Sequence, residues 1–202
     1  MLTVHHLNLS RSKRVLWLLE ELGVNYELVQ HQRDKTTRLA PDTLKAIHPL
    51  SKAPVIVDGE LTLCESSTIC EYILNQYGEN HLRPALNDPE YYSYLEWSHF
   101  AEGSLTLPVI TNMFMQMEKR NGDQPMDGYI AKEIALDFSY IENTLSDKDY
   151  FSGREFGAAD IMMTIVLEMA ANTGLLKGKE NTLAYLSKMQ SREAYKKAAA
   201  QG

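Results

Sequence analysis

The stretch KAPVIVDGELTLCES, residues 52–66, decides the fold of the first part of the chain. Two runs rich in Val, Ile, Leu and Thr, residues 54–57 and 60–63, flank Asp58-Gly59, a dipeptide typical of a two-residue hairpin turn. Pro54 opens the first run, and because proline has no backbone N–H it favours the edge or the first position of a strand. The stretch therefore predicts a β-hairpin whose first strand begins at a proline.

The segments on either side of this hairpin complete a mixed pattern of strands and helices. A strand, a crossover helix and a second strand imply a parallel pair, and the hairpin adds an antiparallel pair. The order βαβ, helix, β-hairpin, helix therefore predicts a four-stranded mixed sheet with helices on both faces, the thioredoxin arrangement. The expected strands outside the hairpin are residues 2–7 and 26–29, and the expected helices are 15–22, 41–47 and 67–77.

The predicted secondary structure changes near residue 78, from mixed strands and helices to helices alone. Residues 78–88, GENHLRPALND, combine Gly, Pro, Asn and Asp without an apolar period and predict a linker. Beyond it the strand signals vanish, so we expect an α/β domain at 1–77, which is thioredoxin-like, and an all-helical domain at 89–202. The expected helices of the second domain are 89–119, bent near Pro108, 126–145, 158–171, 180–189 and 191–200.

Composition and charge argue against several classes of partner. The 202 residues carry 20 Lys and Arg against 27 Asp and Glu, a net charge of −7, whereas nucleic-acid binders usually present a basic face. No apolar run is long enough to span a membrane, and the N-terminal MLTVHHLNLS has no signal-peptide pattern. Cys64 and Cys70 are too few for a disulfide scaffold and lack zinc-ligand spacing. We therefore expect a cytoplasmic protein that binds no nucleic acid, membrane or metal.

Two features at the ends of the hairpin suit a small peptide with a charged head group. Pro54 leaves a backbone edge at which Ala53 could form main-chain hydrogen bonds with an extended ligand. Glu65 and Ser66 stand where the following helix begins, so a carboxylate, a hydroxyl and free helix N–H groups meet there. The structural alternatives are a proline that only protects a strand edge and a serine that only caps the helix.

Four segments in matching order resemble the soluble glutathione transferases, the first of them resembling a bacterial and fungal branch of that family. They correspond to the family's first helix, the loop and strand ahead of its glutathione site, its acid–serine motif and the start of the central helix of its second domain. The resemblance covers nearly the whole chain and implies an enzyme with glutathione as co-substrate, assembled as a homodimer. The segments are residues 10–27 (SRSKRVLWLLEELGVNYE), 48–56 (HPLSKAPVI), 64–73 (CESSTICEYI) and 150–163 (YFSGREFGAADIMM).

The resemblance implies a role for each residue around the hairpin. In the family the proline corresponding to Pro54 is cis, and the residue before it, here Ala53, pairs its backbone with the cysteinyl unit of glutathione. Glu65 would pair with the ammonium of the γ-glutamyl unit, and Ser66 with its carboxylate. Lys52 could pair with the glycine carboxylate, and an ordinary loop lysine is the alternative.

Activation of the thiol is expected in the loop before the first helix. A free thiol has a pKa of about 8.5, and lowering it by about two units requires about 2.7 kcal/mol of selective anion stabilisation. By resemblance a residue of this loop contacts the sulfur, and Ser10 is the first candidate because the loop holds neither tyrosine nor cysteine. Ser12 and the backbone N–H of Arg11 or Ser12 are the alternates, and one of the serines is expected to cap the helix.

The second substrate is expected against the helical domain. Trp97, Phe100, Met113 and Phe114 lie on its first long helix and suit an adaptable apolar pocket, with a plain helix-bundle core as the alternative. The resemblance implies a transferase that conjugates the glutathione thiolate to small hydrophobic electrophiles, a detoxification chemistry. The alternative functions are glutathione-dependent reduction of a disulfide or peroxide and a non-catalytic interaction module.

One position departs from the family pattern. The central helix of the second domain usually opens with Ser or Thr three residues before Asp, but here Gly157 precedes Asp160. Half of a capping box is therefore missing, at an expected cost of only a few tenths of a kcal/mol because glycine is a tolerable N-cap.

Overall fold

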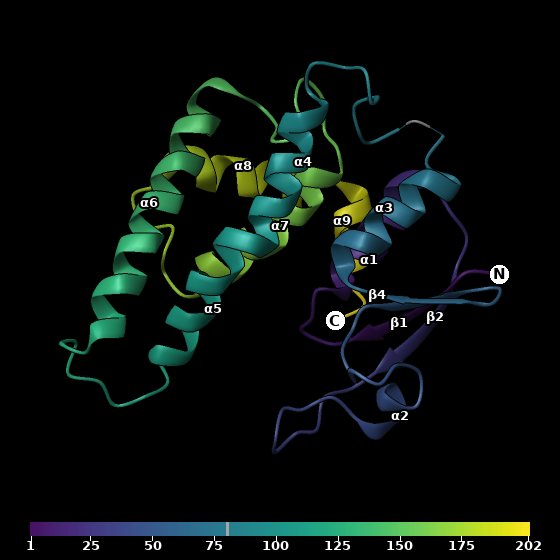
Figure 1. Ribbon diagram of the computed structural model, residues 1–202, viewed down its shortest axis with the longest axis horizontal. Helices are drawn as coiled ribbons and strands as arrows, with labels where there is room; N and C mark the ends of the chain where they lie inside the picture. Colours follow the sequence, from purple (N-terminus) through teal and green to yellow (C-terminus); the bar gives the residue numbers. More distant parts are fainter. Residues whose placement is uncertain (80) are drawn as a thin grey trace. The chain divides into compact units, whose positions relative to one another are not determined.

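A four-stranded mixed sheet in the order β2-β1-β3-β4 forms the centre of the first part of the chain (Figure 1). The computed structural model describes residues 1–79 and 81–202. In the sheet, β1 (Thr3–Leu7) pairs in parallel with β2 (Glu27–His31) and antiparallel with β3 (Val55–Asp58). β3 also pairs antiparallel with β4 (Leu61–Cys64) across the hairpin. The thioredoxin-like fold class predicted from the sequence is therefore confirmed.

Contacts divide the chain into two compact units. The first comprises Met1–Leu82 and Ser191–Gly202, and the second comprises Arg83–Gln190. The division falls inside the predicted linker 78–88, of which residue 80 lies outside the described residues. The end of the chain packs with the first unit, although the sequence pattern groups it with the helical domain. Since periodicity does not tell which unit a terminal helix joins, the domain limits drawn from the sequence stay predictions.

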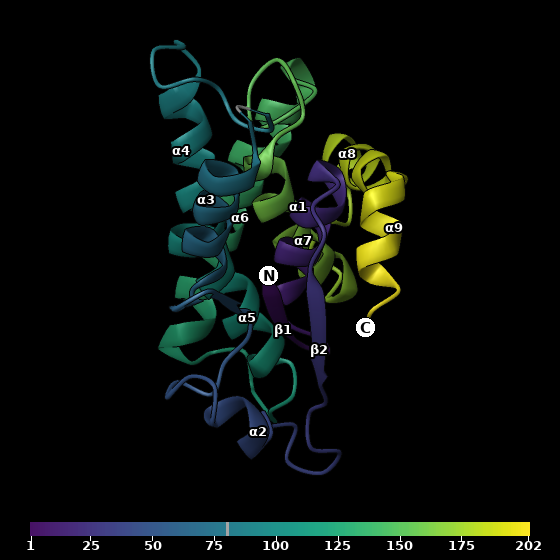
Figure 2. The ribbon, with the colours of Figure 1, turned by 90° about the vertical axis from the view of Figure 1, so that its right-hand side faces the viewer.

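Helices cover both faces of the sheet in the first unit (Figure 1). α1 (Ser12–Leu22) and α3 (Ser66–Tyr77) lie on one face, and the short α2 (Asp42–Lys45) lies on the other. Leu44 of α2 is fully buried in a cluster with residues of β1 and β3. Figure 2 shows the C-terminal α9 (Glu193–Ala199) alongside α1.

α1 is buried along most of its length. Residues 15–19, VLWLL, have no exposed surface. Tyr195 of α9 packs edge-on against Trp17 of α1, with ring centroids 5.1 Å apart. Arg192 donates to both carboxylate oxygens of Glu21, at 2.6 and 2.9 Å. The C-terminal segment is therefore joined to α1 by an aromatic contact and a bidentate ion pair.

The second unit is helical, as predicted. α7 is buried along nearly its whole length and packs against α4, α5 and α8, which explains why its sequence is apolar on all sides. Among the described residues, no helix combines the length and the apolar character needed to cross a membrane. The elements are α4 (Tyr91–Phe100), a π-helical turn η1 (Ala101–Leu105), α5 (Thr106–Met115), α6 (Pro125–Asp147), α7 (Ala158–Asn172) and α8 (Glu180–Gln190).

The helix predicted over 89–119 with a bend near Pro108 is present over a shorter range, 91–115, and contains a π-helical turn just before Pro108. α4 ends at Phe100, the π-helical turn follows, and α5 ends at Met115. The irregular turn precedes Pro108 because proline has no N–H to offer the carbonyl of Ser104 and its ring crowds that carbonyl. A wider turn at this point accommodates the missing hydrogen bond.

A serine from the preceding loop compensates for the glycine at the start of α7. Asp160 is fully buried and accepts the N–H of Gly157 at 3.0 Å, the half of the capping box that the sequence retains. Ser152 Oγ accepts the N–H of Asp160 at 3.4 Å and so replaces the hydroxyl that glycine lacks. Tyr185 and the N–H of Phe151 also donate to the carboxylate, each at 2.7 Å. Burial raises the pKa of Asp160, and these donors oppose that shift.

Candidate functional site

The ends of three strands meet at one edge of the sheet. His5 of β1 lies opposite Val55 of β3, and Val55 lies opposite Cys64 of β4. Because both pairs are antiparallel, the segment after β1, the segment before β3 and the segment after β4 lie at the same edge. Ala53 and Cys64 both pack against a buried cluster that contains Leu7 and Val55. Three segments that the sequence predicted to be functional therefore come together within the first unit.

The segment before β3 has the geometry implied by the resemblance. The peptide bond between Ala53 and Pro54 is cis. Ala53 lies outside the strand pairings of β3, which begin at Val55. Pro54 is buried, Ala53 is half-buried and Lys52 is exposed. An extended ligand could thus pair with the Ala53 backbone and reach the Lys52 ammonium in solvent.

The segment after β4 combines an exposed acid with a buried hydroxyl. Glu65 is exposed and has φ 72, a left-handed conformation that is uncommon for a residue with a side chain. Ser66 is the first residue of α3 and is 4% exposed. Its Oγ accepts a hydrogen bond from Nη1 of Arg14 at 3.0 Å. Since that bond uses an acceptor site, the Ser66 O–H and the unpaired N–H groups of the helix start remain to donate to an anion.

Arg14 was missed by sequence reasoning. It has no exposed surface, and it lies in the first turn of α1, 52 residues before its partner Ser66. The signal in the sequence was a charged residue directly before the apolar run 15–19, because a buried arginine requires a partner. Its positive charge behind Ser66 favours an anionic ligand at the start of α3.

The loop before α1 holds a chain of hydroxyl groups. Ser10 Oγ lies 2.6 Å from Ser12 Oγ and accepts the backbone N–H of Ser12 at 3.2 Å. Ser12 Oγ in turn lies 2.8 Å from Nδ1 of His6 on β1. Ser12 and His6 have no exposed surface, whereas Ser10 is half-buried. Of the two serines considered for contact with sulfur, Ser10 is the one with surface to offer a ligand.

The capping of α1 is also carried by Ser10. Arg11 occupies the N-cap position and makes no capping hydrogen bond through its side chain. The Ser10 hydroxyl instead accepts an N–H of the first turn. Ser10 could therefore cap the helix and contact the sulfur at the same time, because one hydroxyl can accept from the helix and donate to a ligand.

The two cysteines and the metal-ligating side chains were the other candidates for a site among the described residues. Burial raises the pKa of Cys70 to about 12, so its thiol is protonated at neutral pH. Cys64 is half-buried and packs against the cluster under the sheet edge. In the part of the chain that the structure describes, no three His, Cys, Asp or Glu side chains lie close enough to hold a metal ion.

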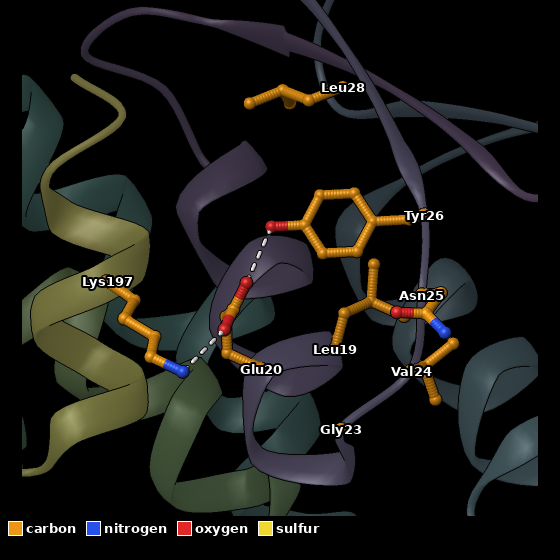
Figure 3. Close-up of a pocket in the computed structure, with 8 residues that line it drawn as sticks. All are labelled: Leu19, Glu20, Gly23, Val24, Asn25, Tyr26, Leu28 and Lys197. Atoms are coloured by element: carbon orange, nitrogen blue, oxygen red, sulfur yellow. Dashed lines mark hydrogen bonds and ion pairs between the residues drawn. The ribbon is translucent and has the colours of Figure 1, made fainter.

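A hollow of about 440 Å³ lies beside the opposite end of α1 (Figure 3). Glu20 accepts the hydroxyl hydrogen of Tyr26 at 2.9 Å, and its carboxylate lies 3.5 Å from Nζ of Lys197. Burial raises the pKa of Tyr26, and Glu20 adds to this effect. Glu20, Tyr26 and Lys197 thus pair with one another at this hollow. Its lining also includes Leu19, Gly23, Val24, Asn25 and Leu28.

The residues suggested for an electrophile pocket lie in the second unit in different environments. Trp97 is 1% exposed and stacks on Tyr140 with ring centroids 4.7 Å apart. It is therefore a core residue, which is the alternative left open by the sequence. Phe100 and Met113 are half-buried, and Phe114 is 56% exposed. Their part in substrate binding stays a prediction.

The fold and the site together define a class of protein. A thioredoxin-like sheet carries a cis proline at the edge where a helix-start serine is held by a buried arginine. A separate helical unit follows this sheet in the chain. This is the architecture that the sequence resemblance implied for the soluble glutathione transferases.

Comparison with known proteins places the chain in that family. The model described as "Glutathione S-transferase, N-terminal domain" matches residues 4–81, and "Glutathione S-transferase, C-terminal domain" matches residues 104–193. Glutathione S-transferase 3 of Schizosaccharomyces pombe is 35% identical over 176 residues, which cover 81% of this chain and 72% of that protein. The chain belongs to the glutathione S-transferase family, and the prediction that it is a glutathione transferase enzyme is confirmed.

Solved structures agree with this assignment. A glutathione S-transferase of Actinobacillus pleuropneumoniae has a TM-score of 0.90 at 32% identity, over 100% of this chain and 92% of that chain. A glutathione transferase of Phanerochaete chrysosporium, solved with oxidized glutathione, has a TM-score of 0.82 at 20% identity, over 99% of this chain and 94% of that chain. The second similarity supports the fold alone.

Proposed function

We propose that this chain binds glutathione at the sheet edge of its first unit and transfers the glutathionyl group to small hydrophobic electrophiles. The observation that carries the proposal is the convergence of Ser10, Ala53 with the cis Pro54, and Ser66 at one edge of the sheet. Each of these groups suits a different part of the tripeptide. Membership of the glutathione S-transferase family supports the same ligand.

The γ-glutamyl unit is assigned to the start of α3. Its carboxylate would accept hydrogen bonds from the Ser66 hydroxyl and from the helix N–H groups, with the Arg14 guanidinium behind them. Its ammonium would pair with Glu65, whose carboxylate is exposed beside that helix start. Both charges of the head group thus have a partner of opposite sign.

The rest of the tripeptide is assigned to the segment before β3. The cysteinyl backbone would pair with the Ala53 backbone, which the strands of the sheet leave unpaired. The glycine carboxylate would then lie toward the exposed Lys52. This direction leaves the cysteinyl sulfur toward the loop before α1.

The chemistry follows from ionisation of the sulfur. The Ser10 hydroxyl would donate a hydrogen bond to the thiolate and lower the pKa of the thiol, and the N-terminus of α1 would favour the negative charge. The thiol proton is released to solvent. The sulfur lone pair then forms a bond with the electrophilic carbon, and in an aryl halide the carbon–halogen bond breaks and halide leaves.

The experiment combines retention on immobilised glutathione with a conjugation assay on an aryl halide. The proposal predicts both retention and halide release at a rate above the uncatalysed reaction. Activity on a mixed disulfide or a hydroperoxide without conjugation would favour the reductase alternative instead. Failure to bind glutathione would favour a non-catalytic interaction module and contradict the proposal.

Assembly and location are proposed from family membership. We expect a homodimer that works in the cytoplasm and takes part in detoxification. Light scattering on the purified protein tests the first point, with twice the chain mass of 23.0 kDa as the expected result. A mass equal to a single chain would contradict it.

A further inference from the structure

Arg33, in the segment that follows β2, binds the loop that carries the proposed sulfur-contacting residue. Its Nε donates to the backbone carbonyl of Asn8 at 3.1 Å, and its Nη2 donates to the carbonyl of Leu9 at 3.3 Å. Its backbone N–H donates to Oδ1 of Asn8 at 2.8 Å. Because β1 and β2 are parallel, the segments that follow them lie at the same edge of the sheet. Arg33 therefore holds the two residues that directly precede Ser10.

The two carbonyls of this loop that Arg33 binds are consecutive, and this fixes the conformation of Leu9. Each carbonyl lies in the plane of its own peptide group, and the two planes that meet at Leu9 turn relative to each other only through its φ and ψ. The guanidinium is a rigid planar fork, so binding both carbonyls at once fixes the angle between the planes. The second plane ends at Cα of Ser10, so the same contact sets the position of Ser10.

The conformation held in this way is one that leucine seldom adopts. Leu9 has φ 51, in the left-handed region where a side chain crowds the backbone. Its side chain is 66% exposed, so packing contributes little to holding it there. Arg38 has φ 61, and its carbonyl accepts a hydrogen bond from Nη1 of Arg33 at 3.0 Å. One guanidinium thus binds the carbonyls of two residues in a strained conformation.

The charge of Arg33 has no carboxylate partner among the described residues. Its side chain donates instead to the three backbone carbonyls of Asn8, Leu9 and Arg38. Burial lowers the pKa of the guanidinium, and the neighbouring Arg38 lowers it further. Since no ion pair offsets the cost of holding this charge here, the hydrogen bonds to the two loops must offset it.

We propose that Arg33 is a positioning residue for the transferase reaction, which keeps Leu9 in its left-handed conformation and thereby holds the Ser10 hydroxyl where it contacts the glutathione sulfur. On its other side, Ser10 is tied to the first turn of α1 by the N–H of Ser12 at 3.2 Å. This inference rests on the proposed function, because the contact between Ser10 and the sulfur is part of that function.

The first test measures the ionisation of glutathione bound to the enzyme, from the ultraviolet absorbance of the thiolate as pH is raised. Arg33→Lys keeps the positive charge but lacks the planar fork that reaches several carbonyls. We expect it to lower the ionisation constant of the bound thiol about threefold to tenfold, the range that one hydrogen bond supports. Glutathione affinity should stay within about twofold, because the head group is assigned to α3.

Lys35→Gln is the matched control for charge. It removes an exposed cation from the same segment and should change neither the ionisation constant nor the affinity. A loss in Lys35→Gln equal to that in Arg33→Lys would overturn the positioning role, because the segment rather than the guanidinium fork would then be responsible.

A mutant cycle with Ser10→Ala separates positioning from a general structural effect. If Arg33 acts by placing the Ser10 hydroxyl, Arg33→Lys should have no further effect on the ionisation constant once that hydroxyl is absent. Equal effects of Arg33→Lys in the wild-type and Ser10→Ala backgrounds would overturn the positioning role, because Arg33 would then act on the thiol independently of Ser10.

Two substitutions of Leu9 test the same conformation with the arginine intact. Both variants should fold, because this side chain is exposed. Glycine adopts positive φ as readily as negative φ, whereas a β-branched valine disfavours it. We expect Leu9→Gly to keep the ionisation constant within about twofold of wild type and Leu9→Val to lower it about threefold to tenfold. Equal constants in the two variants, or the reverse order, would contradict the inference.

The outcomes separate this inference from the function on which it rests. A bound thiol in wild type with the same pKa as free glutathione would contradict the proposed activation of the sulfur and, with it, the inference. A lowered thiol pKa in wild type that Arg33→Lys and Leu9→Val both leave unchanged would overturn the positioning role alone.

Discussion

Ser10 holds two hydrogen bonds within the protein and is still half-buried rather than buried. Ser12, two residues further on, has no exposed surface. Single residues therefore divide the work of the loop, with one hydroxyl offered to the ligand and the other held inside. This division favours the first candidate for contact with sulfur, although the assignment itself stays a proposal.

We predict that Ser10→Ala lowers the turnover of conjugation about tenfold to a hundredfold, since a hydrogen bond to a charged group contributes about 1.5–3 kcal/mol. Glutathione affinity should stay within a few-fold, because the head group and backbone contacts remain. Steady-state kinetics and calorimetry measure the two quantities. Ser187→Ala on the exposed surface of α8 is the matched control. Unchanged turnover in Ser10→Ala would remove Ser10 from the mechanism.

In the proposed site, Ser66 binds the γ-glutamyl head group with Arg14 behind it. Ser66→Ala should weaken glutathione binding about tenfold to a hundredfold, because the glutathione carboxylate loses a hydrogen-bond donor and the Arg14 guanidinium loses the Ser66 hydroxyl as an acceptor. Thr68→Ala, at an exposed position of the same helix, should leave the dissociation constant unchanged. Calorimetry at constant pH compares the two variants. Equal affinities would place the γ-glutamyl unit elsewhere.

A pair of histidines predicts lower stability in mild acid. His5 Nδ1 lies 3.1 Å from His31 Nε2, and His31 Nδ1 lies 3.0 Å from Thr43 Oγ1. Burial lowers the pKa of both rings below their ordinary value of 6.5, and for His5 the neighbouring His31 lowers it further. Below about pH 6.5 the unfolded chain takes up protons that the folded pair does not bind, so the free energy of unfolding falls as pH is lowered.

Denaturant unfolding at about pH 7.5 and about pH 5.5 measures this loss. We expect the transition of wild type to move to lower denaturant in acid, and that of His31→Gln to move less. The same change in both proteins would show that other groups cause the acid sensitivity.

At the scale of elements, features set by neighbouring residues could be predicted from the sequence, whereas tertiary contacts could not. The hairpin, the proline at its mouth and the helix start at Ser66 all follow from neighbouring residues, and the structure contains each of them. The contact between Arg14 and Ser66 could not be predicted, because it joins residues 52 positions apart. The bend expected near Pro108 corresponds to the π-helical turn η1, which lies just before it because proline affects the carbonyl four residues earlier.

The C-terminal helix α9 shows the same limit. Its periodicity predicts a helix but not the helix that it packs against. In the structure Tyr195 is 7% exposed and lies edge-on to Trp17, and Lys197 faces Glu20. α9 therefore completes the first unit, which contains the proposed glutathione site.

We predict that Tyr195→Ala lowers the free energy of unfolding by about 3 kcal/mol, as expected when a buried aromatic side chain is removed. Lys196→Ala on the exposed side of α9 should cost less than about 0.5 kcal/mol. Denaturant unfolding of both variants measures the difference. Equal stability of the two variants would contradict the packing of α9 on α1.

At the scale of the whole molecule, the chain joins a unit with a sheet to a unit of helices. This division could be predicted because the alternation of strands and helices ends near residue 78 and helical periods continue beyond it. The electrophile pocket could not be predicted in the same way. An apolar side chain such as Trp97 gives the same sequence pattern whether it lies in a core or lines a pocket. Residues for the proposed glutathione site could be named from the sequence because they carry charge and turn signals that a core does not need.

The central claim is that one edge of the sheet binds the whole tripeptide, with its sulfur at Ser10. A crystal structure of the protein with glutathione tests this most directly. The expected result is the γ-glutamyl carboxylate on Ser66 and the start of α3, the cysteinyl backbone on Ala53, and the sulfur within hydrogen-bond distance of Ser10 Oγ. Glutathione bound away from this edge, or a sulfur that contacts a different group, would contradict the claim.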